Sequence, residues 1–310
     1  MRVLITGASG FVGQAVAKAL SHKGHEIVRA VRKEQADAVV VGNIGPETNW
    51  EEPLKKCGVV IHLAARVHVM NEKSSDPMTE FRRVNVEGTA VLARQAAAAG
   101  VKRFIFLSSI KVNGEYSESG QPFTANDAPR PEDPYGISKY EAEKILQAIA
   151  SETGMEVVII RPPLVYGPGV KANFESMMHW LSMGLPIPLA AITKNRRSLV
   201  ALDNLVHLIM TCLNSPNAAN QTFLVSDGED LSTAQLLERM GAEMGKPARL
   251  FYLPSALLKL GTILLNRPST YQRLCGSLQL DITKTRQLLG WTPPVSVQEG
   301  LRRAAEGYRL

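Results

Sequence analysis

The first twenty residues, "MRVLITGASGFVGQAVAKAL", constrain the fold more than any other stretch of the chain. An apolar run leads into three glycines, and apolar residues then recur at the spacing of a helix. This pattern predicts a strand, a tight turn and a helix. We expect Gly7 to permit the turn, Gly10 to let the backbone approach a pyrophosphate, and Gly13 to let the helix pack closely. The turn is thus a candidate phosphate cradle for a dinucleotide; the alternative is a purely structural turn.

Apolar runs alternate with helical patterns through the first half of the chain. The runs are "HEIVRAV", "AVVV", "VVIHLAA", "RFIFLSS", "EVVIIRP" and, later, "TFLV". Unbroken Val, Ile and Leu suit strands buried on both faces of a parallel sheet, and we expect helices over 84–99 and 134–152 between them. The order predicts the α/β class, with a Rossmann-type doubly wound parallel sheet.

Beyond residue 166 the chain changes to loops rich in Gly and Pro and to short helical patterns. We therefore expect a smaller C-terminal α/β domain that binds substrate. The predicted division assigns 1–167 to a dinucleotide-binding domain, to which 199–226 returns, and assigns 168–198 and 227–310 to the substrate domain.

Composition narrows the class of partner and the compartment. The net charge of +6, without a polybasic block, favours anionic small molecules over nucleic acid. Three cysteines far apart in the sequence argue for a reducing compartment, so we expect a cytoplasmic protein. The longest apolar stretch, "ALLKLGTILL" at 256–265, is too short to span a bilayer. It predicts a buried or lid-like helix; contact with a membrane surface is the alternative.

The end of the second predicted strand reads "RAVRK". A site that prefers NAD places Asp or Glu there for the ribose hydroxyls, whereas cations suit the 2′-phosphate of NADPH. Arg32 is the candidate contact, and the sequence favours NADPH. The alternative is that these cations are a solvated strand end.

Tyr135 and Lys139 are the candidate catalytic pair. In "DPYGISKYEAEKIL", Asp133 is a plausible N-cap, Pro134 fits the first helical position and Tyr135 lies in the first turn. Lys139 follows at i+4 on the same helix face. Tyrosine titrates near 10, so a nearby cation and a helix N-terminus would help it to exchange protons at neutral pH. Lys139 could supply that cation and also hold a nicotinamide ribose.

Two serines follow the strand "FIFL", where a parallel sheet presents its ligand edge. The hydroxyl of Ser108 or Ser109 could bind the same substrate oxygen as the tyrosine. Ser, Tyr and Lys downstream of a glycine-rich first turn form a specific combination, although each alone is common.

These motifs resemble the extended short-chain dehydrogenase/reductases, the family of nucleotide-sugar epimerases, dehydratases and reductases. The resemblance covers nearly the whole chain, through "TGASGFVG", "HLAA", "NVEGT", "LSSIKVNG", "YGISK", "RPPLVYGPG" and "RSLVALDNLV". It implies catalytic roles for Ser109, Tyr135 and Lys139, and a homodimer formed through the two long helices. The cofactor contacts that it implies are Gly7, Gly10, Phe11, Val12, Gly13, Asn43, Ile44, Ala64, Ala65, Ser108, Tyr135, Lys139 and Pro162.

The resemblance also implies a site for a nucleotide sugar, most simply a UDP-sugar. Asn173 and Phe174 match the segment that wraps the diphosphate, and Arg197 matches an arginine that contacts phosphate. Arg273 is a second candidate of the same kind. Arginine suits phosphate because its planar fork meets two oxygens at once. The alternative for each arginine is a solvated surface charge.

Departures from the family pattern shape the expected reaction. Lys111 replaces the small hydroxyl residue common in epimerases, Asn113 replaces a tyrosine, and Pro163 and Leu164 replace a frequent "FN". The Asp-Glu pair that dehydratases place beside the serine is missing. The histidines form no ligand cluster in the sequence, so no metal site is expected.

The sequence therefore predicts an NAD(P)H-dependent reductase of a UDP-linked 2-acetamido-2,6-dideoxy-4-keto-hexose, in lipopolysaccharide O-antigen biosynthesis. The alternative is a UDP-glucose or UDP-N-acetylhexosamine 4-epimerase, which would use NAD. A more remote alternative is a non-catalytic scaffold that senses a dinucleotide, because a fold alone does not establish activity.

Overall fold

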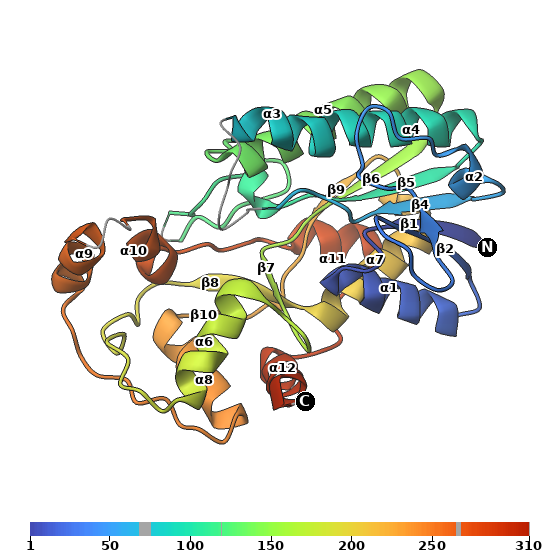
Figure 1. The fold of residues 1–310 in the computed structure, drawn as a ribbon. Helices are drawn as coiled ribbons and strands as arrows, with labels where there is room; N and C mark the ends of the chain where they lie inside the picture. Colours follow the sequence, from blue (N-terminus) through green and yellow to red (C-terminus); the bar gives the residue numbers. More distant parts are fainter. Residues whose placement is uncertain (68–75, 119, 265–267, 310) are drawn as a thin grey trace.

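The computed structural model of the chain describes residues 1–67, 76–118, 120–264 and 268–309. Its centre is a seven-stranded sheet of order β3-β2-β1-β4-β5-β6-β9, in which every pairing is parallel, and a three-stranded sheet of order β10-β8-β7 lies beside it (Figure 1). This confirms the predicted Rossmann-type fold. The strands are β1 Arg2–Thr6, β2 Glu26–Val31, β3 Val39–Val40, β4 Val59–His62, β5 Arg103–Leu107, β6 Glu156–Arg161, β7 Leu164–Tyr166, β8 Arg197–Ala201, β9 Thr222–Leu224 and β10 Asp230–Leu231.

Helices cover both faces of the large sheet, with α3, α4 and α5 on one side and α1 and α7 on the other (Figure 1). The α-helices are α1 Phe11–His22, α2 Glu51–Leu54, α3 Pro77–Arg82, α4 Gly88–Ala98, α5 Pro134–Thr153, α6 Ala172–Ser182, α7 Leu202–Asn214, α8 Thr233–Glu243, α9 Ser255–Leu264, α10 Pro268–Cys275, α11 Thr283–Leu289 and α12 Val297–Arg309. A π-helix, η1 Arg83–Glu87, precedes α4, and two short 3-10 helices are η2 Ile110–Val112 and η3 Pro216–Ala218.

Strand β1 shows why the sequence runs are unbroken. Val3 and Ile5 enter the core beneath α1 and α7, whereas Leu4 enters the core beneath α4 and α5. A strand with a core on each face needs apolar side chains at every position. Because β1 pairs with β2 on one side and β4 on the other, the strand order reverses there, and ligands of such sheets bind at the carboxyl ends beside that reversal.

The second sheet has its own apolar core, made with α6, α8 and α12. The fully buried ring of Tyr166 stacks on that of Phe174 with centroids 5.3 Å apart. Strand β7 pairs with β8 in this small sheet, whereas β9 returns to the edge of the large sheet beside β6. The predicted division into two domains stays a prediction, but the strands show where the chain passes between the two sheets.

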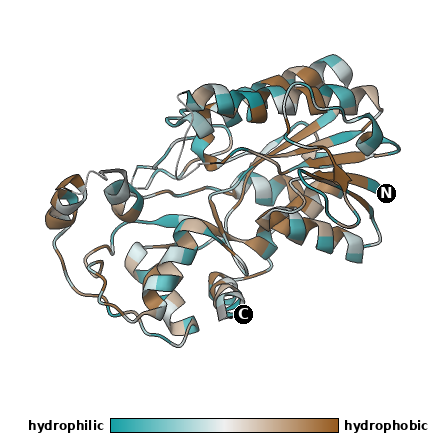
Figure 2. Ribbon diagram, in the orientation of Figure 1, coloured by the Kyte–Doolittle hydropathy of each residue, from teal (hydrophilic) through white to brown (hydrophobic). Residues whose placement is uncertain are grey.

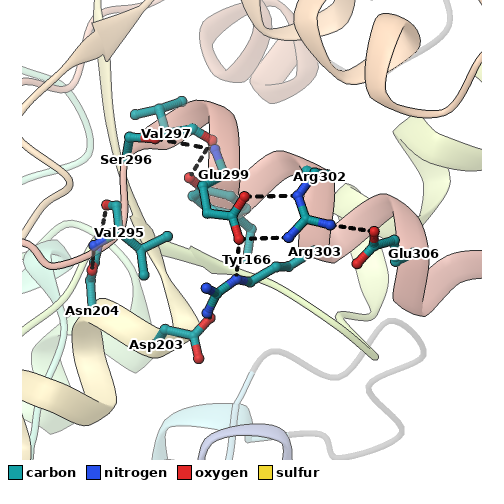
Figure 3. A network of polar contacts seen from close by, with 10 residues as sticks. All are labelled: Tyr166, Asp203, Asn204, Val295, Ser296, Val297, Glu299, Arg302, Arg303 and Glu306. Carbon is teal, nitrogen blue, oxygen red and sulfur yellow. Dashed lines mark hydrogen bonds and ion pairs between the residues drawn. The ribbon is translucent and has the colours of Figure 1, made fainter.

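Buried polar groups join the two sheets. Asp227 accepts hydrogen bonds from the Tyr166 hydroxyl at 2.7 Å, the Asn204 amide at 2.6 Å and the Ala201 N–H at 2.8 Å. Burial raises the pKa of Asp227, while these hydrogen bonds oppose the rise. Asn204 also pairs with both backbone groups of Val295, just before α12 (Figure 3). The start of α12 is thereby fixed to α7.

Ion pairs extend this attachment along α12 (Figure 3). Glu299 accepts from Arg302 and Arg303, each at 2.7 Å, and Arg303 reaches Asp203 of α7 at 3.0 Å. These hydrogen bonds lower the pKa of Glu299 to about 2. They lie at the surface, where each ion pair adds little to stability and mainly fixes geometry.

Helix α9 differs from the sequence expectation. The expected helix forms, but none of its side chains is buried, and it lies at the periphery of the molecule with α10 (Figure 1). Its last expected residue, position 265, lies outside the described residues. The prediction of a buried helix is therefore wrong, although Leu258 packs half-buried against the core of the smaller sheet; a lid-like helix stays a prediction. Among the described helices, none has the length and apolar character needed to cross a membrane.

Candidate active site

The backbone of the glycine turn after β1 requires glycine at Gly7 and Gly13 and leaves little room for a side chain at Gly10. Gly7 has a positive φ of 68°, and a Cβ there would lie 2.8 Å from the backbone nitrogen of Ala64. A Cβ on Gly13 would lie 2.1 Å from the Gly7 carbonyl oxygen, and one on Gly10 would lie 3.2 Å from the same atom. Gly13 thus lets α1 approach the turn itself.

This turn fits the pyrophosphate of a nicotinamide dinucleotide. Helix α1 begins at Phe11, followed by Val12, and its first turn contains no acidic residue. The N–H groups of a helix's first turn have no partner within the helix, so they are available to an anion. Without Cβ atoms at the three glycines, the backbone is open to such a ligand.

The loop after β4 forms a backbone wall beside the turn. Ala64 donates its N–H to the Thr6 hydroxyl at 3.2 Å, and Ala65 follows, half-buried. Asn85 then binds both backbone groups of Arg66, accepting from its N–H at 2.7 Å and donating to its carbonyl at 3.0 Å. Asn85 is buried and lies in the π-helix η1. Its two hydrogen bonds to Arg66 hold the loop after β4 in place.

The residues expected at the adenosine end lie beyond β2 and β3. Arg32 is exposed directly after β2. The backbone pairing of β3 continues for one residue beyond the strand, and Asn43, two residues further on, is exposed. Ile44 is buried, and a Cβ on Gly88 would come within 2.6 Å of its side chain. Gly88 therefore allows α4 to approach Ile44, a requirement that the sequence pattern alone did not reveal.

Tyr135 and Lys139 lie on the first turns of α5, where Asp133 caps the helix by accepting from the Gly136 N–H at 2.7 Å. Lys139 is buried, and its Nζ donates to the Leu107 carbonyl at 2.7 Å. Burial lowers the pKa of Lys139 to about 7, although the charge of Glu143 opposes the fall.

The surroundings of Tyr135 correct one expectation. The sequence suggested that a nearby cation would make its proton easier to lose, but burial, and then the charge of Asp133, raise the pKa of Tyr135. A phenol in this site therefore holds its proton firmly. Its ring also packs edge-on against Phe81 at 6.3 Å.

The structure distinguishes the two serines. Ser108 is buried, and its hydroxyl donates to Glu143 at 2.5 Å, so its side chain is occupied within the protein. Ser109 is half-buried at the start of η2, where its oxygen accepts from the Lys111 N–H at 3.2 Å. Pro162, directly after β6, accepts from the Ile110 N–H at 2.9 Å with its carbonyl and so fixes η2 to the end of β6.

A buried ion pair beneath the site was not found by sequence reasoning. Arg161 at the end of β6 pairs with Glu143 of α5 at 2.5 Å, and both side chains are almost completely buried. Arg161 also donates to Asn113 at 2.9 Å. Glu143 lies one helical turn beyond Lys139. The sequence signal that could have pointed to Glu143 was therefore its i+4 spacing from the lysine of "YGISK".

Lys111 ties the serine segment to the tyrosine helix. Its Nζ lies 2.6 Å from Asp133 and 2.8 Å from Glu115. Burial lowers the pKa of Lys111, but the hydrogen bonds to these two carboxylates outweigh burial, and the net result is a raised pKa. The sequence marked Lys111 only as a departure from a family pattern; here it braces the N-cap of α5.

The residues expected to bind substrate have different surroundings. Arg197 is half-buried and donates to the Gly276 carbonyl at 3.1 Å, while burial lowers its pKa against the opposing charge of Glu115. Asn173 is exposed at the start of α6, and Arg273 is exposed in the last turn of α10. Phe174 has no exposed surface. Its expected role as a ligand contact is corrected, because the ring belongs to the core of the smaller sheet.

No group of three or more His, Cys, Asp or Glu side chains could hold a metal ion among the residues that the structure describes. His62, at the end of β4, is buried and hydrogen bonded to Thr6 at 2.6 Å and Thr89 at 2.9 Å. Burial, and then the charge of Lys139, lower the pKa of His62 to about 3, so the ring is neutral at physiological pH.

Comparison with known proteins gives the same family as the motifs. The model of the NAD dependent epimerase/dehydratase family matches residues 3–226. A UDP-glucose 4-epimerase of Vibrio cholerae is 49% identical over 99% of this chain and 95% of its own length. A UDP-glucose 4-epimerase of Mycolicibacterium smegmatis is 27% identical over 100% of this chain and 99% of its own length.

A solved structure, MoeE5 in complex with UDP-glucuronic acid and NAD, has the same fold with a TM-score of 0.78. It is 25% identical, and the alignment covers 100% of this chain and 99% of that one. The family match spans the glycine turn, the serine segment and the Tyr-Lys helix described above. The chain therefore belongs to the NAD dependent epimerase/dehydratase family, as an enzyme of the short-chain dehydrogenase/reductase type that works with a nicotinamide cofactor.

Proposed function

We propose that the protein is a UDP-hexose or UDP-N-acetylhexosamine 4-epimerase. The observation that carries this proposal is the Vibrio cholerae UDP-glucose 4-epimerase, which is 49% identical along nearly the full length of both chains. An epimerase needs one acid/base group at the C4 oxygen and a firmly held dinucleotide. Ser109, Tyr135 and Lys139 at the carboxyl edge of the sheet, beside the glycine turn, are the residues assigned to those tasks.

Each side chain has a separate part in the proposed reaction. A bound nicotinamide would supply reversible hydride transfer at C4 of the sugar. Tyr135 exchanges a proton with the C4 oxygen, and its raised pKa keeps it protonated for donation to the keto sugar. Ser109 hydrogen bonds the same oxygen. Lys139, with a pKa of about 7, can take up and return the tyrosine proton as the direction reverses.

The diphosphate of the substrate is assigned to Arg197. This half-buried guanidinium is under the electrostatic influence of the Glu115 carboxylate and donates one hydrogen bond to the Gly276 carbonyl. Because a guanidinium carries five N–H donors, the remaining donors can serve phosphate oxygens. Asn173 at the start of α6 and Arg273 on α10 are the more peripheral candidates.

The second candidate is the reductase of a UDP-linked 4-keto sugar, with NADPH as the consumed cofactor. One specific observation favours it. Lys111, two residues after Ser109, occupies the place of a small hydroxyl residue and is paired with Asp133 and Glu115, so the sugar would meet a charged cluster there. Surface polysaccharide synthesis, including O-antigen, would be the setting of either activity. We also propose that the enzyme acts in the cytoplasm as a homodimer through α4 and α5.

The deciding experiment follows the C4 centre and the cofactor together. The purified protein is incubated with UDP-glucose or UDP-N-acetylglucosamine plus NAD, and the C4 epimer is measured by proton NMR. A parallel reaction contains a UDP-2-acetamido-2,6-dideoxy-4-keto-hexose and NADPH. We expect epimer without net change in nicotinamide absorbance. Stoichiometric bleaching of NADPH with the keto sugar, and no epimerisation, would replace the epimerase with the reductase.

Two variants accompany that experiment. Tyr135→Phe keeps the ring and removes the proton donor, so turnover should fall by about 10²- to 10⁴-fold while the dinucleotide still binds. Normal turnover in Tyr135→Phe would remove this residue from the mechanism. Arg32→Asp tests the cofactor: if Arg32 holds a 2′-phosphate, the variant should lose affinity for NADPH but not for NADH.

A further inference from the structure

An apolar surface is exposed around α9. We define the α9 surface as the exposed apolar side chains of α9 and of the segment that leads into it. Phe251 and Tyr252 precede the helix, and four large aliphatic side chains lie on it. Their exposed fractions are Phe251 45%, Tyr252 72%, Leu257 52%, Leu260 52%, Ile263 53% and Leu264 77%. Figure 2 shows apolar residues along α9 at the edge of the molecule. Clusters of exposed large apolar side chains mark interaction sites.

The charge of this region has one sign. The described residues 244–264 and 268–280 include four basic residues, Lys246, Arg249, Lys259 and Arg273, and no acidic residue. Lys259 is exposed on α9, Arg273 is exposed on α10, and Arg249 is exposed two residues before Phe251. Exposed apolar side chains and exposed cations therefore occur together in this region.

The α9 surface is joined to the part of the molecule that carries Arg197. Helix α10 packs against α9, and the Leu274 carbonyl near its end accepts from Thr233 at 2.6 Å. The next carbonyl beyond α10, that of Gly276, accepts from Arg197. The helix pair is therefore anchored beside the candidate phosphate arginine.

We propose that the α9 surface binds an anionic lipid surface. Interfacial helices combine exposed Leu, Ile, Phe and Tyr side chains with Lys and Arg, and they are attracted by acidic phospholipids. A second copy of the chain fits less well, because a two-fold contact through this surface would place Lys259 and Arg273 opposite cations without any acidic partner. This inference does not depend on which sugar reaction the site performs.

Vesicle flotation tests the proposal. The full chain is mixed with vesicles of phosphatidylcholine alone or with about one third phosphatidylglycerol, at low and high salt. We expect flotation with the anionic vesicles, weakened by salt. The double variant Leu257→Gln, Leu260→Gln should reduce the bound-to-free ratio by about tenfold. Trp180→Gln is the matched control, because Trp180 of α6 is 52% exposed but lies on another helix.

A second measurement needs no variant. Hydrogen exchange of residues 251–264 should slow in the unaltered protein when anionic vesicles are added, while exchange in α6 stays the same. The proposal is overturned if the unaltered protein does not float, or if the double variant floats equally well. It is also overturned if light scattering shows that the double variant converts a dimer to a monomer, since the surface would then be an interface between copies.

Discussion

Two lysines lie close to the first turns of α5, and their surroundings are opposite. Lys139 is buried, and burial lowers its pKa to about 7; its Nζ donates to a backbone carbonyl and lies 4.2 Å from the centre of the Phe106 ring. Lys111 bonds the carboxylates of Asp133 and Glu115, and its pKa is raised.

The difference shows how one residue type can have two functions within a single site. A lysine that titrates near neutral pH can exchange a proton during a reaction, whereas a lysine paired with two carboxylates stays charged and fixes geometry. The same comparison explains why the sequence motif identified Lys139 and gave no role to Lys111. A sequence motif identifies the residue that reacts. The residue that fixes the geometry can be identified only when the fold shows which carboxylates lie near it.

The largest effect should come from Lys139→Met. Turnover should fall by about 10²- to 10⁴-fold, because the proton-exchanging group is lost. Stability should change in the opposite direction. The lowered pKa of Lys139 means that the unfolded chain binds more protons between about pH 7 and the ordinary lysine pKa, so the native lysine destabilises the fold most at and below pH 7. Melting curves should show the variant more stable than the parent at pH 6, with the gap closing towards pH 10.

Glu143→Gln should have the largest effect on stability among the site variants. It leaves Arg161 buried without its anion, which costs about 3–5 kcal/mol in comparable buried pairs. The double variant Glu143→Leu, Arg161→Met should recover part of that loss in urea unfolding. If the single variant were as stable as the parent protein, the pair would not be a structural support for the α5 lysine.

A smaller change, about tenfold in kcat, is expected for Lys111→Met, since one positioning contact is removed. Without the cation, the Asp133 charge acts more strongly on Tyr135, so the alkaline limb of the pH profile should move to higher pH. Lys111→Arg should restore most of the activity. The control is Lys55→Met, which removes an exposed pair with Glu52 away from the site. Equal losses in the two Met variants would contradict a positioning role for Lys111.

The smallest expected effect is in the pH profile of the unaltered enzyme. The rate should rise several-fold as the pH increases through about 7, because Lys139 must lose its proton before it can accept one from Tyr135. A profile of kcat against pH measures this directly. The rise should be absent from the residual activity of Lys139→Met, and its persistence there would assign the ionisation to another group.

Local patterns were sufficient for much of the fold and for the centre of the site. The glycine turn, the alternation of strands and helices, and the helix start at Asp133 depend on neighbouring residues, so they could be predicted. The Glu143–Arg161 pair could not, because its partners come from a helix and a strand that only the fold brings together. Phe174 was misjudged because adjacent residues of a helix point in different directions: Asn173 is exposed, but the next ring is in the core.

The same limit applies to Tyr135 and to α9. A pKa depends on burial and on every nearby charge, and the Asp133 that caps the helix also disfavours the tyrosinate. For α9, an apolar run predicted burial from composition, but no side chain of the helix is fully buried, and Leu258 packs against the core of the smaller sheet as a half-buried side chain. Periodicity alone could not show that the large apolar side chains of this run would stay exposed.

The polar junction at Asp227 has a consequence for how the chain folds. This carboxylate accepts hydrogen bonds from Tyr166 of β7, from Asn204 of α7 and from the backbone N–H just before α7. Segments more than sixty residues apart in the sequence therefore meet at one carboxylate. A fragment that stops at residue 226 would complete the seven-stranded sheet but leave the Tyr166 hydroxyl and the Asn204 amide without their shared acceptor. We therefore expect the two sheets to unfold together, and calorimetry of the whole chain should show a single melting transition.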